Sequence, residues 1–103
     1  VVIVNVMTGG PNIFIPNGFS PNGDGINDYF EITGIQEFPG NEIKIFNRWG
    51  NLIFQGTGYQ NDWRGTNQNG EFLPDGTYYY IINLNDDRNT VYSGFVQVHR
   101  GNR

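Results

Sequence analysis

Several residue types on which common folds and active sites depend are absent from this sequence or nearly so. The chain has no cysteine, which excludes a disulfide framework and a thiolate zinc site. It has no alanine, one methionine and one lysine, so long helices have few of the residues that favour them. No apolar run approaches the length of a membrane span. These absences favour a β-rich chain.

Catalytic groups are also scarce. The single histidine, His99, lies in the last expected strand, where it is either a general base or a surface histidine. The second interpretation is favoured because no serine or cysteine lies in a recognisable nucleophile elbow. Asp62, Glu71 and Asp75 are scattered over loops, where solvation explains them better than a glycosidase pair. We expect a protein that is not an enzyme.

The charge balance bears on the partners of the chain. A formal net charge of −4 argues against nucleic-acid binding, which needs a basic footprint. It also argues against adsorption to an anionic membrane surface. The sequence begins without Met and without a signal-peptide pattern, so we interpret it as a piece of a longer protein.

Aromatic and turn-forming residues, by contrast, are abundant. Aromatic residues make up 16% of the chain, with 15 glycines and 5 prolines, which favours short strands packed through large rings. Strands are expected in Val1–Met7, Ile13–Ile15, Tyr29–Thr33, Glu42–Gln55, Thr77–Leu84 and Thr90–Arg100. Gly50 and Asn51 supply the hairpin turn within the fourth segment. The pattern predicts an all-β, Ig-like antiparallel β-sandwich of about seven strands.

Alternation along the last two expected strands predicts which side chains face the core. The predicted inward residues are Tyr78, Tyr80, Ile82, Leu84, Tyr92, Val96 and Val98. We expect residues 1–12 to be a linker or an extra edge strand, residues 13–100 to be the domain, and residues 101–103 to be a frayed terminus.

The loop Ser20–Glu31 has oxygen-bearing side chains at the spacing of an EF-hand calcium loop. Its candidate ligands are Asn22, Asp24, Asp28 and Glu31, and Gly25 stands where such loops need a glycine. Ser20 at the first position, the neighbouring proline and the strand-like residues that follow weaken the match. The alternative is turn chemistry, in which Asn and Asp side chains hydrogen-bond their own backbone. The sequence leaves both interpretations open.

Two Arg–Trp pairs are candidate anchors. Arg48 and Trp49 lie at the expected hairpin tip, where they form either an interface hot spot or a structural pin. For Trp63, beside Arg64, a structural role is favoured, since a long loop needs an anchor to stay ordered. We therefore take Arg48 and Trp49 as the candidate partner-binding residues. We also expect the terminal hairpin Thr77–Arg100 to belong to the recognition surface, because its outer strand can present unpaired N–H and C=O groups.

Four ordered blocks of this sequence resemble the gliding-motility-associated C-terminal domain, the type B sorting domain of the Bacteroidota type IX secretion system. The blocks are Phe14–Asp28 (FIPNGFSPNGDGIND), Ile45–Gly50 (IFNRWG), Tyr59–Gly65 with Trp63, and Pro74–Tyr80 (PDGTYYY). In the third block Arg64 stands where the family usually has Asp. The resemblance runs from about Ile13 to Arg100.

The resemblance implies a role in protein export and does not imply that the domain catalyses a reaction. Such domains direct large proteins, including surface adhesins, through the outer membrane to the cell surface or the medium. It implies that the partners are outer-membrane components of the type IX system and a dedicated outer-membrane protein. We expect the domain to be a monomer that does not insert into the membrane. The alternative is an adhesive or carbohydrate-binding sandwich that uses Trp49, Trp63 and the tyrosines as sugar platforms.

Overall fold

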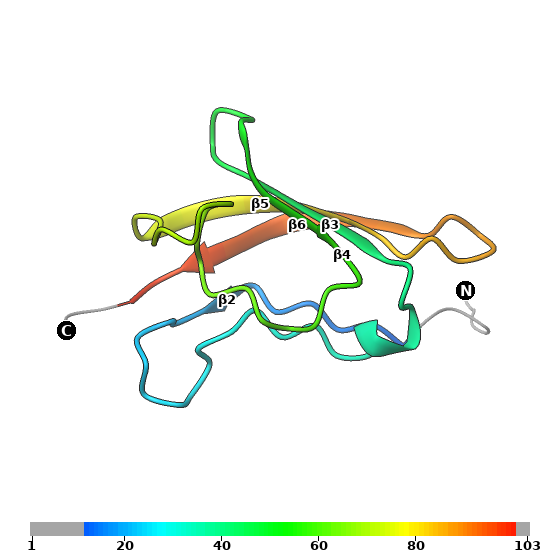
Figure 1. Ribbon diagram of the computed structural model, residues 1–103, viewed down its shortest axis with the longest axis horizontal. Coiled ribbons are helices and arrows are strands. Elements are labelled where there is room, and N and C mark those ends of the chain that lie inside the picture. The colour runs from blue at the N-terminus through cyan, green and yellow to red at the C-terminus, as the bar shows by residue number, and fades with distance from the viewer. Residues whose placement is uncertain (1–11, 101–103) are drawn as a thin grey trace.

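The structure is a computed structural model that describes residues 12–100. Its strands form one five-stranded mixed sheet in the order β2-β6-β5-β3-β4 (Figure 1). The elements are β2 (Gly18–Phe19), the 3-10 helix η1 (Ile35–Glu37), β3 (Glu42–Phe46), β4 (Leu52–Thr57), β5 (Gly76–Asn83) and β6 (Val91–Val98). No helix in this part of the chain is long and apolar enough to cross a membrane. The expected strand at Val1–Met7 and the expected frayed end lie outside the described residues.

The β5–β6 hairpin forms the centre of the sheet and confirms the predicted alternation. Tyr78 is opposite Val96 on the inner face, and Tyr79 is opposite Phe95 on the outer face. Of the predicted inward residues, Tyr78, Tyr80, Ile82, Leu84, Val96 and Val98 are buried and Tyr92 is half-buried. Period-two alternation therefore predicted the orientation of both strands correctly.

The inner face of the sheet is covered by the segments that join β2 to β3 and β4 to β5 (Figure 1). These segments supply Phe30, Ile32, Ile35, Tyr59 and Trp63 to the core, all of them buried. The Trp63 ring packs edge-on against Phe30 with the ring centres 6.0 Å apart. Burying such side chains contributes roughly 1.5–3 kcal/mol each, so the covering layer carries a large share of the stability.

Tyr59 ties the covering layer together with one buried hydroxyl. The hydroxyl donates a hydrogen bond to the Phe30 carbonyl at 2.6 Å and accepts one from the Trp63 N–H at 3.0 Å. The Tyr59 N–H in turn donates to the buried side-chain oxygen of Asn41 at 3.0 Å. Without these partners, the backbone groups of the covering layer would be buried without hydrogen bonds.

The all-β prediction is confirmed, whereas the seven strands and the Ig-like antiparallel sandwich are not. In the described residues, β2 pairs with β6 in parallel, and Ile13–Ile15 and Tyr29–Thr33 meet through a single bridge, Phe14 with Thr33. The second segment forms no longer ladder because its N–H groups bond elsewhere: that of Ile32 donates to the Asn61 side chain. Extended residues whose N–H groups bond to one another or to a distant loop thus replace two of the expected strands.

Arg100 fastens the end of β6 to the loop between β4 and β5. Its guanidinium donates to the Gly65 carbonyl at 2.8 Å and to the Leu73 carbonyl, and it lies over the Phe72 ring, 4.5 Å from the ring centre. The Arg100 N–H donates to the carboxylate of Asp75 at 3.2 Å. These bonds hold the last described residues of the chain against that loop.

Candidate partner-binding site at the turn between β3 and β4

The turn between β3 and β4 is held rigidly by Asn47. Its side-chain oxygen accepts hydrogen bonds from the N–H groups of Trp49 and Asn51, both at 3.0 Å. Its backbone N–H donates to the Asn51 carbonyl, and its carbonyl accepts from the Gly50 N–H. Gly50 has a φ of 81°, a left-handed conformation that glycine adopts without strain. The predicted hairpin turn is thus confirmed, and an asparagine closes it.

This rigid turn carries Arg48 and Trp49 on its outside. Trp49 is 71% exposed, so it does not pack on a loop as a structural pin would. The Arg48 guanidinium lies 4.4 Å from the centre of the Trp49 ring, a cation–π contact, and forms no hydrogen bond to a carbonyl within residues 12–100. The geometry leaves both side chains available to a partner.

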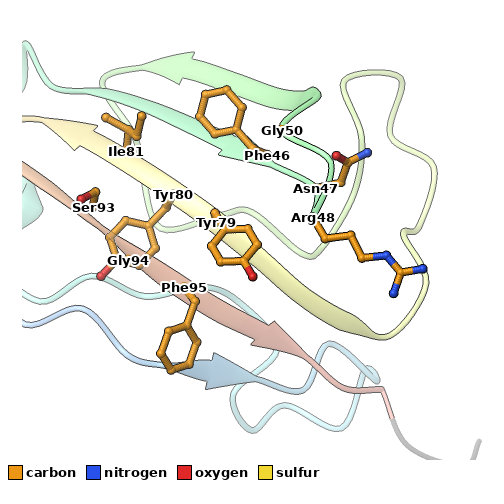
Figure 2. A pocket seen from close by; sticks show the side chains of 10 residues that line it. All are labelled: Phe46, Asn47, Arg48, Gly50, Tyr79, Tyr80, Ile81, Ser93, Gly94 and Phe95. Atoms are coloured by element: carbon orange, nitrogen blue, oxygen red, sulfur yellow. The ribbon is translucent and has the colours of Figure 1, made fainter.

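The turn borders an apolar groove on the outer face of the sheet. In Figure 1 the turn rises from the sheet on the side opposite the covering layer. The groove has a volume of about 600 Å³ and is lined by Phe46, Tyr79, Ile81 and Phe95 from the strands and by Arg48 from the turn. Figure 2 shows these side chains on three neighbouring strands with the turn beside them. The candidate residues therefore lie at the end of a larger surface.

Most strand residues of this groove lie in the terminal hairpin Thr77–Arg100, which was expected to belong to the recognition surface through its backbone groups, but their side chains were not singled out from the sequence. A signal for them exists in the run Tyr78–Ile82, in which all five residues are aromatic or aliphatic. An inward-facing tyrosine alternates there with an equally apolar outward-facing neighbour, such as Tyr79 or Ile81. A strand that is apolar on both faces indicates two contact surfaces, and only the inner one is covered in the described residues.

The predicted calcium loop is closed by hydrogen bonds between its side chains and its backbone. The Asp28 carboxylate accepts from the N–H groups of Gly25 at 2.7 Å, Gly23 at 2.9 Å and Asn22 at 3.1 Å. Asn22 accepts in the same way from the Asp24 N–H. Burial raises the pKa of Asp28, but the hydrogen bonds from these N–H groups lower it by a larger amount. The pKa of Asp28 therefore lies below its ordinary value.

These bonds are the turn chemistry that was the alternative to calcium. N–H groups aimed at a carboxylate present positive ends, which oppose a cation at the same place. Among residues 12–100, no group of three or more His, Cys, Asp or Glu side chains is placed to hold a metal ion. Glu31 is exposed. The calcium site stays a prediction.

The other candidates have structural surroundings. Trp63 is buried, and its ring N–H donates to the Thr66 carbonyl at 2.8 Å, so it is an anchor and no sugar platform. The exposed His99 has its ring nitrogen Nδ1 3.4 Å from the Asp75 carboxylate. The Asp75 carboxylate also accepts a hydrogen bond from the Arg100 N–H. The Glu71 carboxylate accepts one from the side-chain amide of Asn67.

Comparison with known proteins identifies a family match over most of the chain. Residues 13–98 match the family of the CHU_C type IX secretion signal domain. Among curated proteins no relative matches the chain.

A similar fold occurs in a solved structure of PorZ from Porphyromonas gingivalis, which is described as an essential bacterial surface component of the type IX secretion system. The two superpose with a TM-score of 0.59 and 22% sequence identity over 86% of this chain. The match spans only 12% of the PorZ chain. At this identity the likeness concerns the fold alone.

Proposed function

The chain belongs to the type IX secretion signal domain family, and from this premise we propose that its signal is read as a folded surface centred on Arg48 and Trp49. Family membership makes the chain an export signal for the protein that carries it. What we add is the form of the signal: side chains on a rigid turn, presented by a folded domain. A linear peptide signal would need no such turn.

The observation that carries this proposal is the placement of the turn. Trp49 and Arg48 project outward from a backbone that Asn47 fixes with several hydrogen bonds. Tryptophan and arginine are the residues that most often dominate binding energy at interfaces. A rigid turn loses little conformational entropy on binding, which favours recognition of these two side chains.

We further propose the type B role, with outer-membrane components of the secretion system and a dedicated outer-membrane protein as partners. The cargo would cross the periplasm and reach the cell surface or the medium. The likeness to a surface component of this system supports the proposal at the level of the fold. The unit that acts would be residues 13–100, monomeric, without catalytic activity, nucleic-acid binding or membrane insertion. We also propose that the sheet and its covering layer are arranged as in an Ig-like domain.

The proposal is tested by fusing the chain to the C-terminus of a periplasm-directed reporter in a bacterium with the type IX machinery. The reporter should appear outside the cells. The Arg48→Ala and Trp49→Ala variants should lower the exported fraction while the purified variants melt like the original chain. Arg64→Ala is the matched control, since Arg64 also lies near exposed rings, of Tyr29 and Phe72, but away from the turn.

Two results would contradict the proposal in different ways. Full export of both turn variants would remove Arg48 and Trp49 from the recognition surface. Cargo that is exported without the domain, but then fails to adhere, would favour the adhesive or carbohydrate-binding module. That alternative has lost Trp63, which is buried.

A further inference from the structure

Four large apolar side chains form a row across the outer face of the sheet. Leu52 on β4 is opposite Phe46 on β3, and Phe46 is opposite Tyr79 on β5. Tyr79 is in turn opposite Phe95 on β6. Side chains opposite each other in a regular ladder lie about 5 Å apart, so Phe46, Tyr79 and Phe95 form one strip. Leu52 continues the strip across a register shift between β3 and β4, and we name the four residues the outer row.

The outer row is accessible along its whole length. Leu52, Tyr79 and Phe95 are 44%, 45% and 43% exposed, and Phe46 is half-buried. Ile81, in the next row, is exposed as well. Single exposed apolar residues are ordinary, but a contiguous strip in a groove is typical of a contact surface.

Two cations flank the groove without an acidic partner. Lys44 lies on the outer face of β3 opposite Ile81, and Arg48 lies at the turn beyond the same strand. Within residues 12–100 neither forms an ion pair with a carboxylate, and the acidic position on this face of β3 is Glu42, two residues before Lys44. With Glu42 counted against Lys44 and Arg48, this part of the face carries one positive charge in excess, whereas the chain as a whole carries a net charge of −4.

We infer that the outer face binds an acidic segment of a partner protein, with apolar side chains on the outer row and carboxylates at Lys44 and Arg48. Charge complementarity selects this occupant. The inference rests on the proposed export function for its biological meaning, and it adds the chemistry of the segment that reads the signal. The binding itself can be measured without any export assay.

Other occupants fit the charges less well. The apolar segment Val1–Met7 of this chain has no acidic residue to pair with Lys44 and Arg48. A second copy packed face to face would bring the same two cations of each copy into one interface. An anionic membrane would repel a chain of this net charge, and the raised turn keeps a flat surface away from the groove.

The strand geometry sets an upper limit on the spacing of the partner's charges. Lys44 and Arg48 are four residues apart, and β3 ends at Phe46, so their backbones are separated by less than the roughly 13 Å that four extended residues would span. An extended segment running along β3 would place two acidic side chains at most four residues apart to match them. An apolar side chain midway between the two would meet the outer row near Phe46.

A matched pair of labelled peptides tests the inference on the purified chain. The acidic probe has nine residues, in which Leu, Glu, Phe, Glu and Leu alternate with serine, so that its glutamates are four residues apart. The basic probe has lysine in place of both glutamates. Fluorescence anisotropy at low salt should give about tenfold tighter binding of the acidic probe, since two exposed ion pairs add modestly to affinity. The difference should shrink in about 1 M salt.

Substitutions on the exposed face locate the binding site. The charge-reversing double variant Lys44→Glu with Arg48→Glu should reverse the preference and bind the basic probe more tightly. Phe95→Ser should weaken both probes. All three positions are exposed, so thermal melts should remain near those of the original chain. Arg64→Glu, away from this face, should leave the preference unchanged.

Several results would overturn the inference. These are absence of binding, equal affinity for the two probes, and a preference that the double variant does not reverse. Dimerisation of the chain through this face in sedimentation experiments would assign the face to a second copy. Binding to phosphatidylglycerol vesicles, with no binding of the acidic probe, would assign it to a membrane. Failure of export with intact peptide binding would contradict the proposed function and leave this inference standing.

Discussion

Replacing Tyr59 with phenylalanine removes one buried oxygen and leaves the ring in place. That oxygen serves both the Phe30 carbonyl, at 2.6 Å, and the Trp63 N–H, at 3.0 Å. Neither group has another hydrogen-bond partner in the described part of the chain, and Tyr59 itself is 6% exposed, so water reaches the site poorly. The Tyr59→Phe variant therefore leaves two buried backbone groups without hydrogen bonds.

The expected loss follows from those two groups. An unsatisfied buried donor or acceptor costs about 1–3 kcal/mol, so with two such groups the free energy of unfolding should fall by about 2–6 kcal/mol. A chain of this size loses about 4 °C of melting temperature for each kcal/mol, which predicts a decrease of about 8–24 °C. A typical domain has only about 5–15 kcal/mol in total, so the variant would be markedly weakened.

Thermal melts and urea titrations followed by circular dichroism measure this loss. The control is Tyr79→Phe, because Tyr79 is exposed on the outer face and its change should stay within about 0.5 kcal/mol. The urea dependence of both variants should match that of the original chain, since the surface exposed on unfolding is unchanged. If the two variants melt together with the original chain, the hydroxyl does not hold the covering layer and the reasoning is refuted.

Three further predictions concern alkaline pH, the end of β6 and the predicted calcium loop. Burial raises the pKa of Tyr59 well above its ordinary value, so the folded chain keeps a proton that the unfolded chain loses near pH 10. The contribution of Tyr59 to the free energy of unfolding should therefore be complete below about pH 10 and be lost as the pH rises above it. The free energy of unfolding of Tyr59→Phe should fall less steeply in the same pH range, and parallel pH profiles of the two chains would contradict this. Arg100→Ala should lower the free energy of unfolding by about 1–3 kcal/mol, because the carbonyls of Gly65 and Leu73 lose a charged donor, and an unchanged urea midpoint would refute it. If the loop binds calcium, excess calcium should raise the melting temperature and Asp24→Ala should abolish that response; coincident melts with calcium and with chelator would leave only turn chemistry.

The parts of the fold that the sequence predicted are those in which a repeating pattern meets a single covered face. Tyr78, Tyr80 and Ile82 alternate with outward residues, and the hairpin of β5 and β6 follows directly from that alternation. The turn at Gly50 was predictable for a similar reason, since its left-handed backbone favours glycine. Local rules were sufficient because local contacts determine these elements.

The covering layer was harder to predict because long-range hydrogen bonds determine it. Tyr29–Thr33 has the composition of a strand, yet its N–H groups bond Asn61 and the Trp63 carbonyl, about thirty residues away in sequence. β2 also escaped prediction, as it has two residues and lies after Pro16 and before Pro21, which donate no hydrogen bonds. Hydrogen bonds to a distant loop, through its backbone and its side chains, replaced the second sheet that the pattern predicted.

The candidate site was predicted in part for a comparable reason. Arg48 and Trp49 stood out by their residue types at a hairpin tip, and the structure places both on the outside of a rigid turn. The terminal hairpin was expected to take part through its backbone, but the outer row of side chains was not predicted, because its members come from four strands and only the register brings them together. Leu52 and Phe95, for example, are far apart in sequence and lie in one strip.

The most direct test of the central claim compares export of one fusion in two strains. The chain is joined to the C-terminus of a periplasm-directed reporter, and the reporter is quantified outside the cells and in the periplasm. One strain has an intact type IX machinery, and the other is the same strain with that machinery inactivated. The account predicts reporter outside the first strain and reporter retained in the periplasm of the second. Equal export from both strains, or retention in both, would contradict it.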